Sequence, residues 1–134
     1  MKELNIPYYF HNKSYPEPEE ISLQLTLGDI WLDFSLNGEC AREMEHLRSG
    51  ETLCWREQGA GEKCRLFFDS VRDGKTYPVA AASKEFSIKK YGERRRRGYE
   101  IVKVQVLYVV WWHNKENTKE GYIALPLIRM RKKK

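Results

Sequence analysis

Residues 99–112 read YEIVKVQVLYVVWW, with an apolar side chain at nearly every second position. This alternation is typical of a β-strand, because successive side chains point to opposite faces of a sheet. The first half of the stretch is apolar on one parity only, whereas the second half is apolar on both. The sequence therefore predicts a long strand that runs from a sheet surface into a covered interior.

The residues that follow predict a partner for this strand. Residues 114–120 are polar and indicate a turn, and residues 121–129 indicate a second strand. Pro126 has no N–H to donate to a sheet ladder, so we expect it at a sheet edge or at a bulge. We expect the basic end of the chain to fray from Arg129 onward, with residues 132–134 as a tail outside the domain.

The clearest alternation lies nearer the N-terminus. Two runs, residues 21–27 and 30–36, place Ile, Leu and Phe on one parity, and Gly28-Asp29 separates them. Apolar alternation around a short glycine-containing turn predicts an antiparallel hairpin with one buried face. Residues 1–20 combine three prolines with several aromatic rings, so we expect an extended N-terminal arm ahead of the hairpin.

Inside this predicted hairpin, residues 27–34 read LGDIWLDF. The stretch resembles the opening strand of the MazF/PemK-type endoribonuclease toxins, which commonly begin with Gly-Asp-Ile followed by an aromatic residue and Asp. The basic-proline element that usually follows in that family is missing here, and a predicted helix stands in its place. The catalytic arginine of the family therefore has no counterpart in this chain.

That helix begins at Asn37, a residue type that caps helix N-termini. Cys40, Met44 and Leu47 follow at helical spacing, and Gly50 suits the left-handed conformation that ends many helices.

Shorter strands are expected downstream, where glycine-containing turns separate apolar pieces. The pieces are residues 52–55, 65–69 and 77–82, and Phe86 with Ile88 indicates a further strand. The predicted fold class is β-rich (all-β or α+β), in one domain over residues 21–131. We expect a strongly curved antiparallel sheet or small barrel of about six or seven strands with one short helix.

Charge is distributed unevenly along the chain. The 134 residues include 24 Lys and Arg against 19 Asp and Glu, a net charge of +5. Residues 84–134 hold 15 of the basic residues and 5 of the acidic ones, so residues 1–83 are acidic overall. A basic surface attracts polyanions, and an acidic surface can meet a basic protein.

The densest positive charge lies at residues 92–98, which read GERRRRG and predict a mobile, exposed loop. Cations on such a loop can bind phosphates, and neighbouring aromatic rings can stack on bases. The candidate residues for binding nucleic acid or another partner are Lys89, Lys90, Tyr91, Arg94, Arg95, Arg96, Arg97, Tyr99, Arg129 and Arg131.

Catalytic and metal-binding patterns are weak in this sequence. No phosphate-binding loop, dinucleotide-binding turn or nucleophile elbow occurs. Cys40, His46, Cys54 and Cys64 lack the close cysteine pair that is usual at structural zinc sites, so we expect no metal and no cofactor. The histidines His11, His46 and His113 are scattered, and we assign no catalytic residue.

The sequence thus favours a small non-enzymatic interaction module that binds nucleic acid or a nucleoprotein through its basic C-terminal half. One alternative is an inhibitor of the type that phages and mobile elements encode, which docks on a larger nucleic-acid-processing enzyme and blocks it. A second alternative is a metal-independent endoribonuclease. The sequence has no signal-peptide core and no membrane span, so we expect a cytoplasmic protein.

Overall fold

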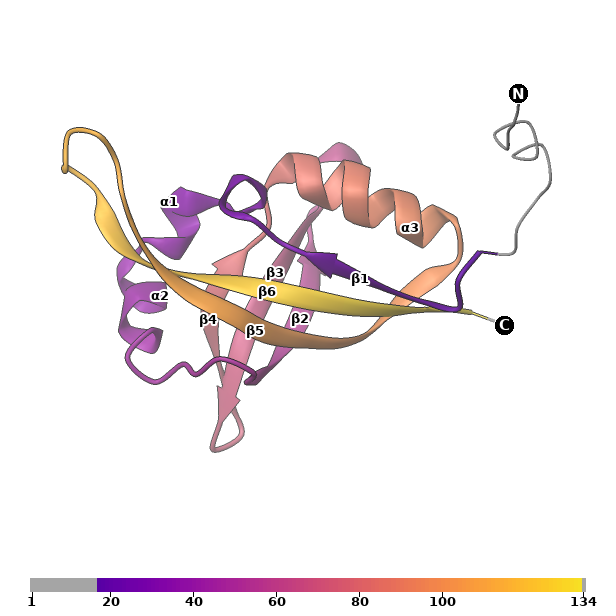
Figure 1. The fold of residues 1–134 in the computed structure, drawn as a ribbon, viewed down its shortest axis with the longest axis horizontal. Coiled ribbons are helices and arrows are strands. Elements are labelled where there is room, and N and C mark those ends of the chain that lie inside the picture. Colours follow the sequence, from indigo (N-terminus) through magenta and orange to yellow (C-terminus); the bar gives the residue numbers. More distant parts are fainter. Residues whose placement is uncertain (1–16, 134) are drawn as a thin grey trace, which may run out of the picture.

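The computed structural model describes residues 17–133, which form one open sheet of six antiparallel strands (Figure 1). The order across the sheet is β1-β6-β5-β2-β3-β4. The strands are β1 (Glu20–Gln24), β2 (Thr52–Gln58), β3 (Arg65–Arg72), β4 (Lys75–Ala81), β5 (Tyr99–His113) and β6 (Glu120–Lys132). The predicted β-rich antiparallel fold is confirmed. Of the two predicted alternatives, the structure has the open sheet and not the closed barrel.

The β5–β6 hairpin is the longest element of the fold, as the alternation at residues 99–112 predicts. Its pairing runs from Tyr99 opposite Lys132 to His113 opposite Glu120. The register shifts between Val106 and Tyr108, beside Pro126. Proline therefore sits at a bulge within an interior strand, one of the two placements that its missing donor permits.

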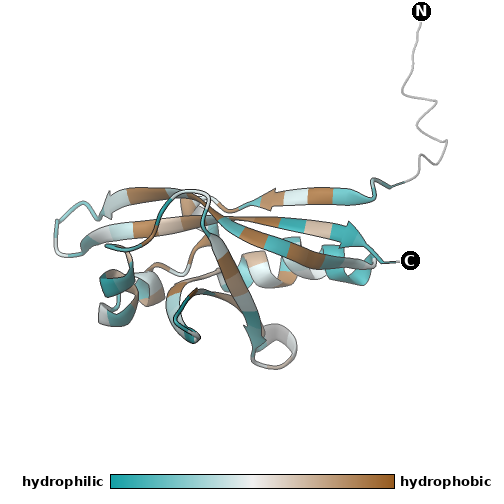
Figure 2. Ribbon diagram, turned by 90° about the horizontal axis from the view of Figure 1, so that it is seen from below, coloured by the Kyte–Doolittle hydropathy of each residue, from teal (hydrophilic) through white to brown (hydrophobic). Residues whose placement is uncertain are grey.

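The sheet changes direction at β2. Only Thr52 and Leu53 pair with β5, and from Cys54 onward β2 pairs with β3. Strands β1, β6 and β5 therefore form one layer, and Figure 2 shows this layer on one side of the molecule with the helices and the β3–β4 hairpin on the other. The main core lies between these parts and includes the fully buried Phe68, Val104 and Ile128.

The helix predicted from Asn37 is confirmed as α2 (Gly38–Glu43). The Asn37 side chain accepts hydrogen bonds from the backbone N–H groups of Glu39 and Cys40, at 3.0 and 3.1 Å. The helix ends earlier than predicted, although Gly50 does adopt a positive φ of 88°.

The predicted hairpin over residues 21–36 is wrong. Strand β1 ends at Gln24 and pairs with β6, and the chain then forms the 3-10 turn η2 (Leu27–Asp29) and the short helix α1 (Leu32–Ser35). The Asp29 carboxylate accepts hydrogen bonds from the N–H and hydroxyl of Thr26. These bonds stabilise a turn directly before the position where the second strand of the hairpin was predicted to begin. The segment that resembles the opening strand of the toxin family is therefore not a strand here.

The predicted mobile loop at residues 92–98, and the predicted strand at Phe86 and Ile88, are also wrong. Residues 84–96 form one continuous helix, called here the basic helix, which contains the π-helical segment η4 (Phe86–Tyr91) and α3 (Gly92–Arg96). The Ser83 hydroxyl accepts a hydrogen bond from the N–H of Phe86 and caps the first turn. Gly98, at a φ of 95°, ends the helix in the left-handed conformation.

The expected fraying from Arg129 does not occur. Strand β6 continues to Lys132, whose N–H donates to the Glu19 carbonyl at 2.7 Å, and the N–H of Lys133 donates to the Gly98 carbonyl at 2.8 Å. The expected arm at residues 1–16 lies outside the described part of the chain, as does Lys134. In the described part, every helix is too short or too polar to cross a membrane.

Strand β1 provides a test of the core. Leu25 is fully buried directly after β1, whereas Gln24 beside it is exposed. We predict that Leu25→Ala lowers the free energy of unfolding by about 2–5 kcal/mol, because it leaves a cavity, while Gln24→Ala changes it by less than about 0.5 kcal/mol. Denaturant titration of both variants measures their free energies of unfolding. Equal decreases would contradict the assignment of Leu25 to the core and of Gln24 to the surface.

Candidate functional site

The basic helix concentrates positive charge on one element. Residues 84–97 contain seven Lys and Arg and two Glu. Lys90 pairs with Asp29 at 3.2 Å, and Arg97 pairs with Glu17 at 3.3 Å. Arg94 and Arg96 form no ion pair with any described residue, so their charge is available to a ligand.

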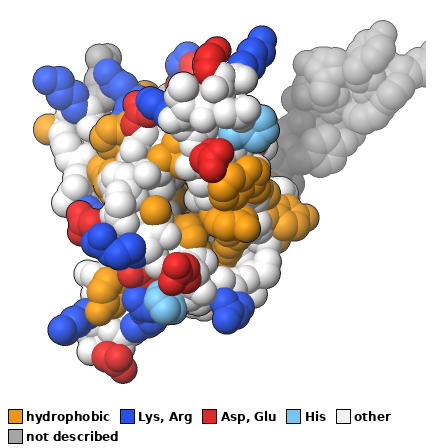
Figure 3. All heavy atoms as spheres, turned by 90° about the vertical axis from the view of Figure 1, so that its left-hand side faces the viewer, with side chains coloured by type: hydrophobic (Ala, Val, Ile, Leu, Met, Phe, Trp, Pro, Cys, Tyr) orange, Lys and Arg blue, Asp and Glu red, His pale blue; other side chains and the backbone are white. Residues whose placement is uncertain are grey.

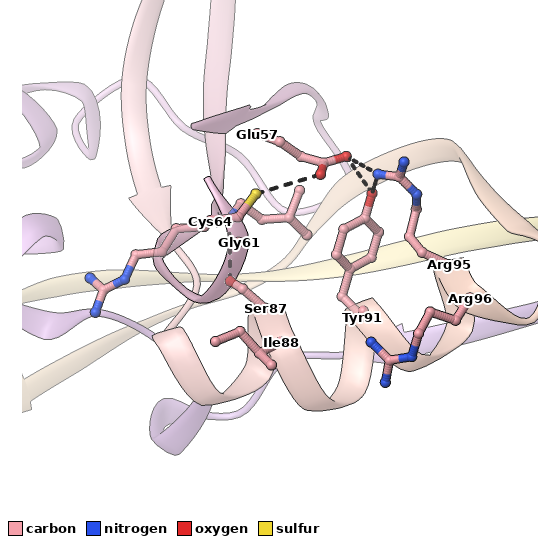
Figure 4. Close-up of a pocket in the computed structure, with 11 residues that line it drawn as sticks. Glu57, Gly61, Cys64, Ser87, Ile88, Tyr91, Arg95 and Arg96 are labelled. Atoms are coloured by element: carbon pink, nitrogen blue, oxygen red, sulfur yellow. Dashed lines mark hydrogen bonds and ion pairs between the residues drawn. The ribbon is translucent and has the colours of Figure 1, made fainter. Parts of the chain in front are cut away.

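A carboxylate on β2 meets the basic helix at its centre. Glu57 Oε2 accepts a hydrogen bond from the Tyr91 hydroxyl at 2.7 Å and also pairs with the Arg95 guanidinium (Figure 4). The same guanidinium donates to the Tyr91 hydroxyl oxygen at 3.2 Å. Glu57, Tyr91 and Arg95 thus form a triad that joins β2 to the helix.

Burial changes the titration of two groups here. Burial, together with the hydrogen bond to Glu57, raises the pKa of Tyr91 to about 12. Burial and the nearby Glu57 charge also raise the pKa of the Cys64 thiol, whose sulfur lies 3.7 Å from Glu57 Oε1. Both groups are therefore protonated at neutral pH and act as neutral donors, and the thiol is a poor nucleophile.

A pocket of about 380 Å³ opens beside the triad, between the segment that joins β2 to β3 and the basic helix (Figure 4). Leu66, Ile88 and the Tyr91 ring supply apolar walls, while Glu57, Cys64 and Arg96 supply polar ones. A volume of this size falls within the range of small-molecule sites.

A second pocket continues from the first on the other side of the triad. It shares Glu57, Tyr91 and Arg95 with the first pocket and adds Trp55 and Lys133. Trp55 is 38% exposed, so the second pocket offers an aromatic surface, with Arg95 and Lys133 also in its lining. We call the two pockets together the β2–helix groove.

The predicted binding residues divide into several groups. Lys89 and Lys90 lie on the basic helix with Arg94, Arg95 and Arg96, and Arg97 caps its end. Arg129 and Arg131 lie on β6, within 3.6 and 3.9 Å of the Glu20 carboxylate. Tyr91 and Tyr99 are only 5% and 2% exposed, so the structure offers neither ring for stacking from solvent.

Other aromatic rings are at the surface instead. Trp111 and Tyr122 are each 52% exposed and meet edge to face on the β5–β6 hairpin, whereas Trp112 packs against the core. Figure 3 views the end of the molecule that carries the β5–β6 turn and shows hydrophobic side chains gathered in one exposed patch.

Sequence reasoning missed Trp55 and Glu57. The two residues share a parity in β2 and therefore a face, which the sequence does indicate. The position of the basic helix beside that face was not predicted, because the charge and the flanking glycines of residues 92–98 predict a loop. The signals for the helix are Ser83 and Gly98, which bracket it as caps.

The residues considered for catalysis and for metal binding are dispersed. His46 follows α2 and His113 ends β5, and neither imidazole hydrogen-bonds a carboxylate among residues 17–133, while His11 lies outside that range. Within the same range no three His, Cys, Asp or Glu side chains are grouped to hold a metal ion. Cys40 is buried, and burial raises its pKa to about 12.

Comparison of the chain with protein-family models, with curated proteins and with solved structures found no match. The functional argument therefore depends on the groove and the basic helix themselves.

The triad predicts a late tyrosine ionisation. In an ultraviolet pH titration of the protein's eight tyrosines, one should ionise near pH 12, and Tyr91→Phe should remove that step. Because the fold favours the neutral phenol, the stability that Tyr91 contributes is complete below about pH 10 and is lost as pH rises toward 12. A late step that persists in Tyr91→Phe would contradict this assignment.

Proposed function

We propose that this protein is a non-enzymatic module that binds single-stranded nucleic acid in the β2–helix groove. One observation carries the proposal: the exposed Trp55 and Arg96, an arginine without an ion pair to any described residue, border the same groove. Trp55 provides a face for base stacking, which is the sequence-tolerant part of single-strand recognition. The basic helix carries Arg94 and Arg96, and Lys133 lies beside Gly98 at the end of this helix. All three side chains are cationic and can contact phosphates.

The charge distribution favours the β2–helix groove, and not strand β6, as the binding site for nucleic acid. Arg129 and Arg131 both approach Glu20, so their charge is partly neutralised. The basic helix has a net charge of +5 over residues 84–97, and its two unpaired arginines have no acidic partner among the described residues. Counterion release on phosphate binding depends on such free cations.

Salt dependence and paired arginine variants test the phosphate contacts. We predict that the logarithm of affinity for a fluorescent single-stranded oligonucleotide falls linearly with the logarithm of salt concentration. The double variant Arg94→Gln, Arg96→Gln should bind at least about tenfold more weakly, since charge-assisted contacts contribute about 1.5–3 kcal/mol each. The control Arg129→Gln, Arg131→Gln removes equal charge and should weaken binding by less than about threefold, because Glu20 already holds both arginines.

A flat response to salt would refute phosphate binding. A larger loss in the Arg129 and Arg131 variant than in the helix variant would place the nucleic acid on the sheet face.

Two exposed tryptophans test the stacking surface. Trp55→Ala should weaken oligonucleotide binding by about 5- to 100-fold, the usual range for one stacked base. Trp111→Ala removes a more exposed ring from the β5–β6 hairpin and should leave the affinity unchanged. The reverse result in fluorescence anisotropy would assign stacking to the hairpin.

The exposed patch on the hairpin favours a second candidate function, docking on a larger protein as an inhibitor. Trp111 and Tyr122 are each 52% exposed and contact each other, and exposed aromatic rings are enriched at protein interfaces. Affinity capture with and without nuclease separates the two functions: a protein partner that survives nuclease treatment supports docking, and loss of all partners supports nucleic-acid binding.

A further inference from the structure

One oxygen of Glu57 is left without a strong partner. Oε2 is occupied by the Tyr91 hydroxyl and the Arg95 guanidinium, whereas among the described residues Oε1 hydrogen-bonds only the Cys64 thiol, at 3.7 Å. A thiol is a weak donor, so this contact leaves most of the acceptor capacity of Oε1 unused. Figure 4 shows Glu57 beside the pocket, with the Tyr91 and Arg95 side chains pointing toward its carboxylate.

The surroundings of this oxygen suit a flat, partly polar ligand. Ile88 is half-buried and gives the pocket an apolar wall that can lie against a base, whereas Leu66 and the Tyr91 ring line it from buried positions. Arg96 borders the pocket, forms no ion pair with a described residue and can meet a phosphate. The triad holds Glu57 from the opposite side and restricts the orientation of its carboxylate.

We propose that the pocket beside Glu57 receives one unstacked nucleobase and selects a base with an exocyclic amino group, which donates to Glu57 Oε1. This inference rests on the proposed single-strand binding and extends it from stacking to base recognition. A carboxylate accepts from the cytosine amino group in the same way in known base readout. Adenine and guanine also carry such a group, and uracil and thymine do not.

Cytosine and uracil have nearly the same shape and therefore isolate the amino group. Cytosine presents an N–H₂ donor at the position where uracil presents a carbonyl oxygen. The remaining ring N–H of uracil lies between two carbonyl oxygens, which the carboxylate repels. Glu57 thus favours cytosine by attraction and disfavours uracil by repulsion, the combination that gives specificity at a binding site.

The test compares oligocytidine and oligouridine RNA of equal length by fluorescence anisotropy at neutral pH. The wild-type chain should bind oligocytidine at least about tenfold more tightly, within the range for discrimination at one base. Glu57→Gln replaces the acceptor oxygens by an amide that both donates and accepts, so the ratio of the two affinities should fall to about threefold or less. A circular dichroism melt establishes that the variant is folded.

Two free cysteines, Cys64 and Cys54, provide a second variant and its control, and both substitutions leave the triad residues in place. Cys64→Met adds volume beside Glu57 Oε1 and should reduce the cytosine preference, whereas Cys54→Met alters an exposed position of β2 that does not line the pocket and should preserve it. If salt-dependent binding occurs but the affinity ratio is near one, or is unchanged in both Glu57→Gln and Cys64→Met, base selection is refuted and single-strand binding stands. If neither RNA binds, or binding is insensitive to salt, the proposed function fails together with this inference.

Discussion

Strands β5 and β6 pair continuously from Tyr99 opposite Lys132 to His113 opposite Glu120, and the other elements are placed by their connections to this hairpin. Strand β1 extends the sheet along β6, and β2 joins β5 through Thr52 and Leu53 alone. The basic helix leads directly into β5 through Gly98. Strand β5 therefore adjoins both the end of the helix and the start of β2, and the groove lies between these two elements.

The triad of Glu57, Tyr91 and Arg95 connects the basic helix to the sheet. One oxygen of the Glu57 carboxylate pairs with both a buried phenol and a guanidinium, and these contacts anchor the helix on β2. The four consecutive arginines differ in their partners. Arg95 and Arg97 pair with acidic residues, whereas Arg94 and Arg96 form no ion pair with a described residue, so paired and unpaired arginines alternate along the sequence of the helix.

Much of the sheet could be predicted from residue alternation, and much of the site could not. The strands predicted at 52–55, 65–69, 77–82, 99–112 and 121–129 from apolar residues and the turns between them overlap the observed strands at 52–58, 65–72, 75–81, 99–113 and 120–132. The segment at 21–36 shows the same alternation but folds into a short strand, a turn and a helix, since β1 pairs with β6 and Asp29 closes the turn. The local alternation of apolar residues does not predict which strand β1 pairs with.

The sequence by itself determined the β-rich class, the long hairpin, the Asn37 helix cap, the restriction of Pro126 to a sheet edge or a bulge, and the concentration of positive charge from residue 84 onward, because each depends on residues that are close along the chain. The tertiary structure alone decided that the helix over residues 84–96 packs beside β2, that Tyr91 and Tyr99 are buried, and that Glu57 meets Arg95 across 38 residues of sequence. Those features depend on burial and on pairing between distant segments, and no local periodicity encodes them.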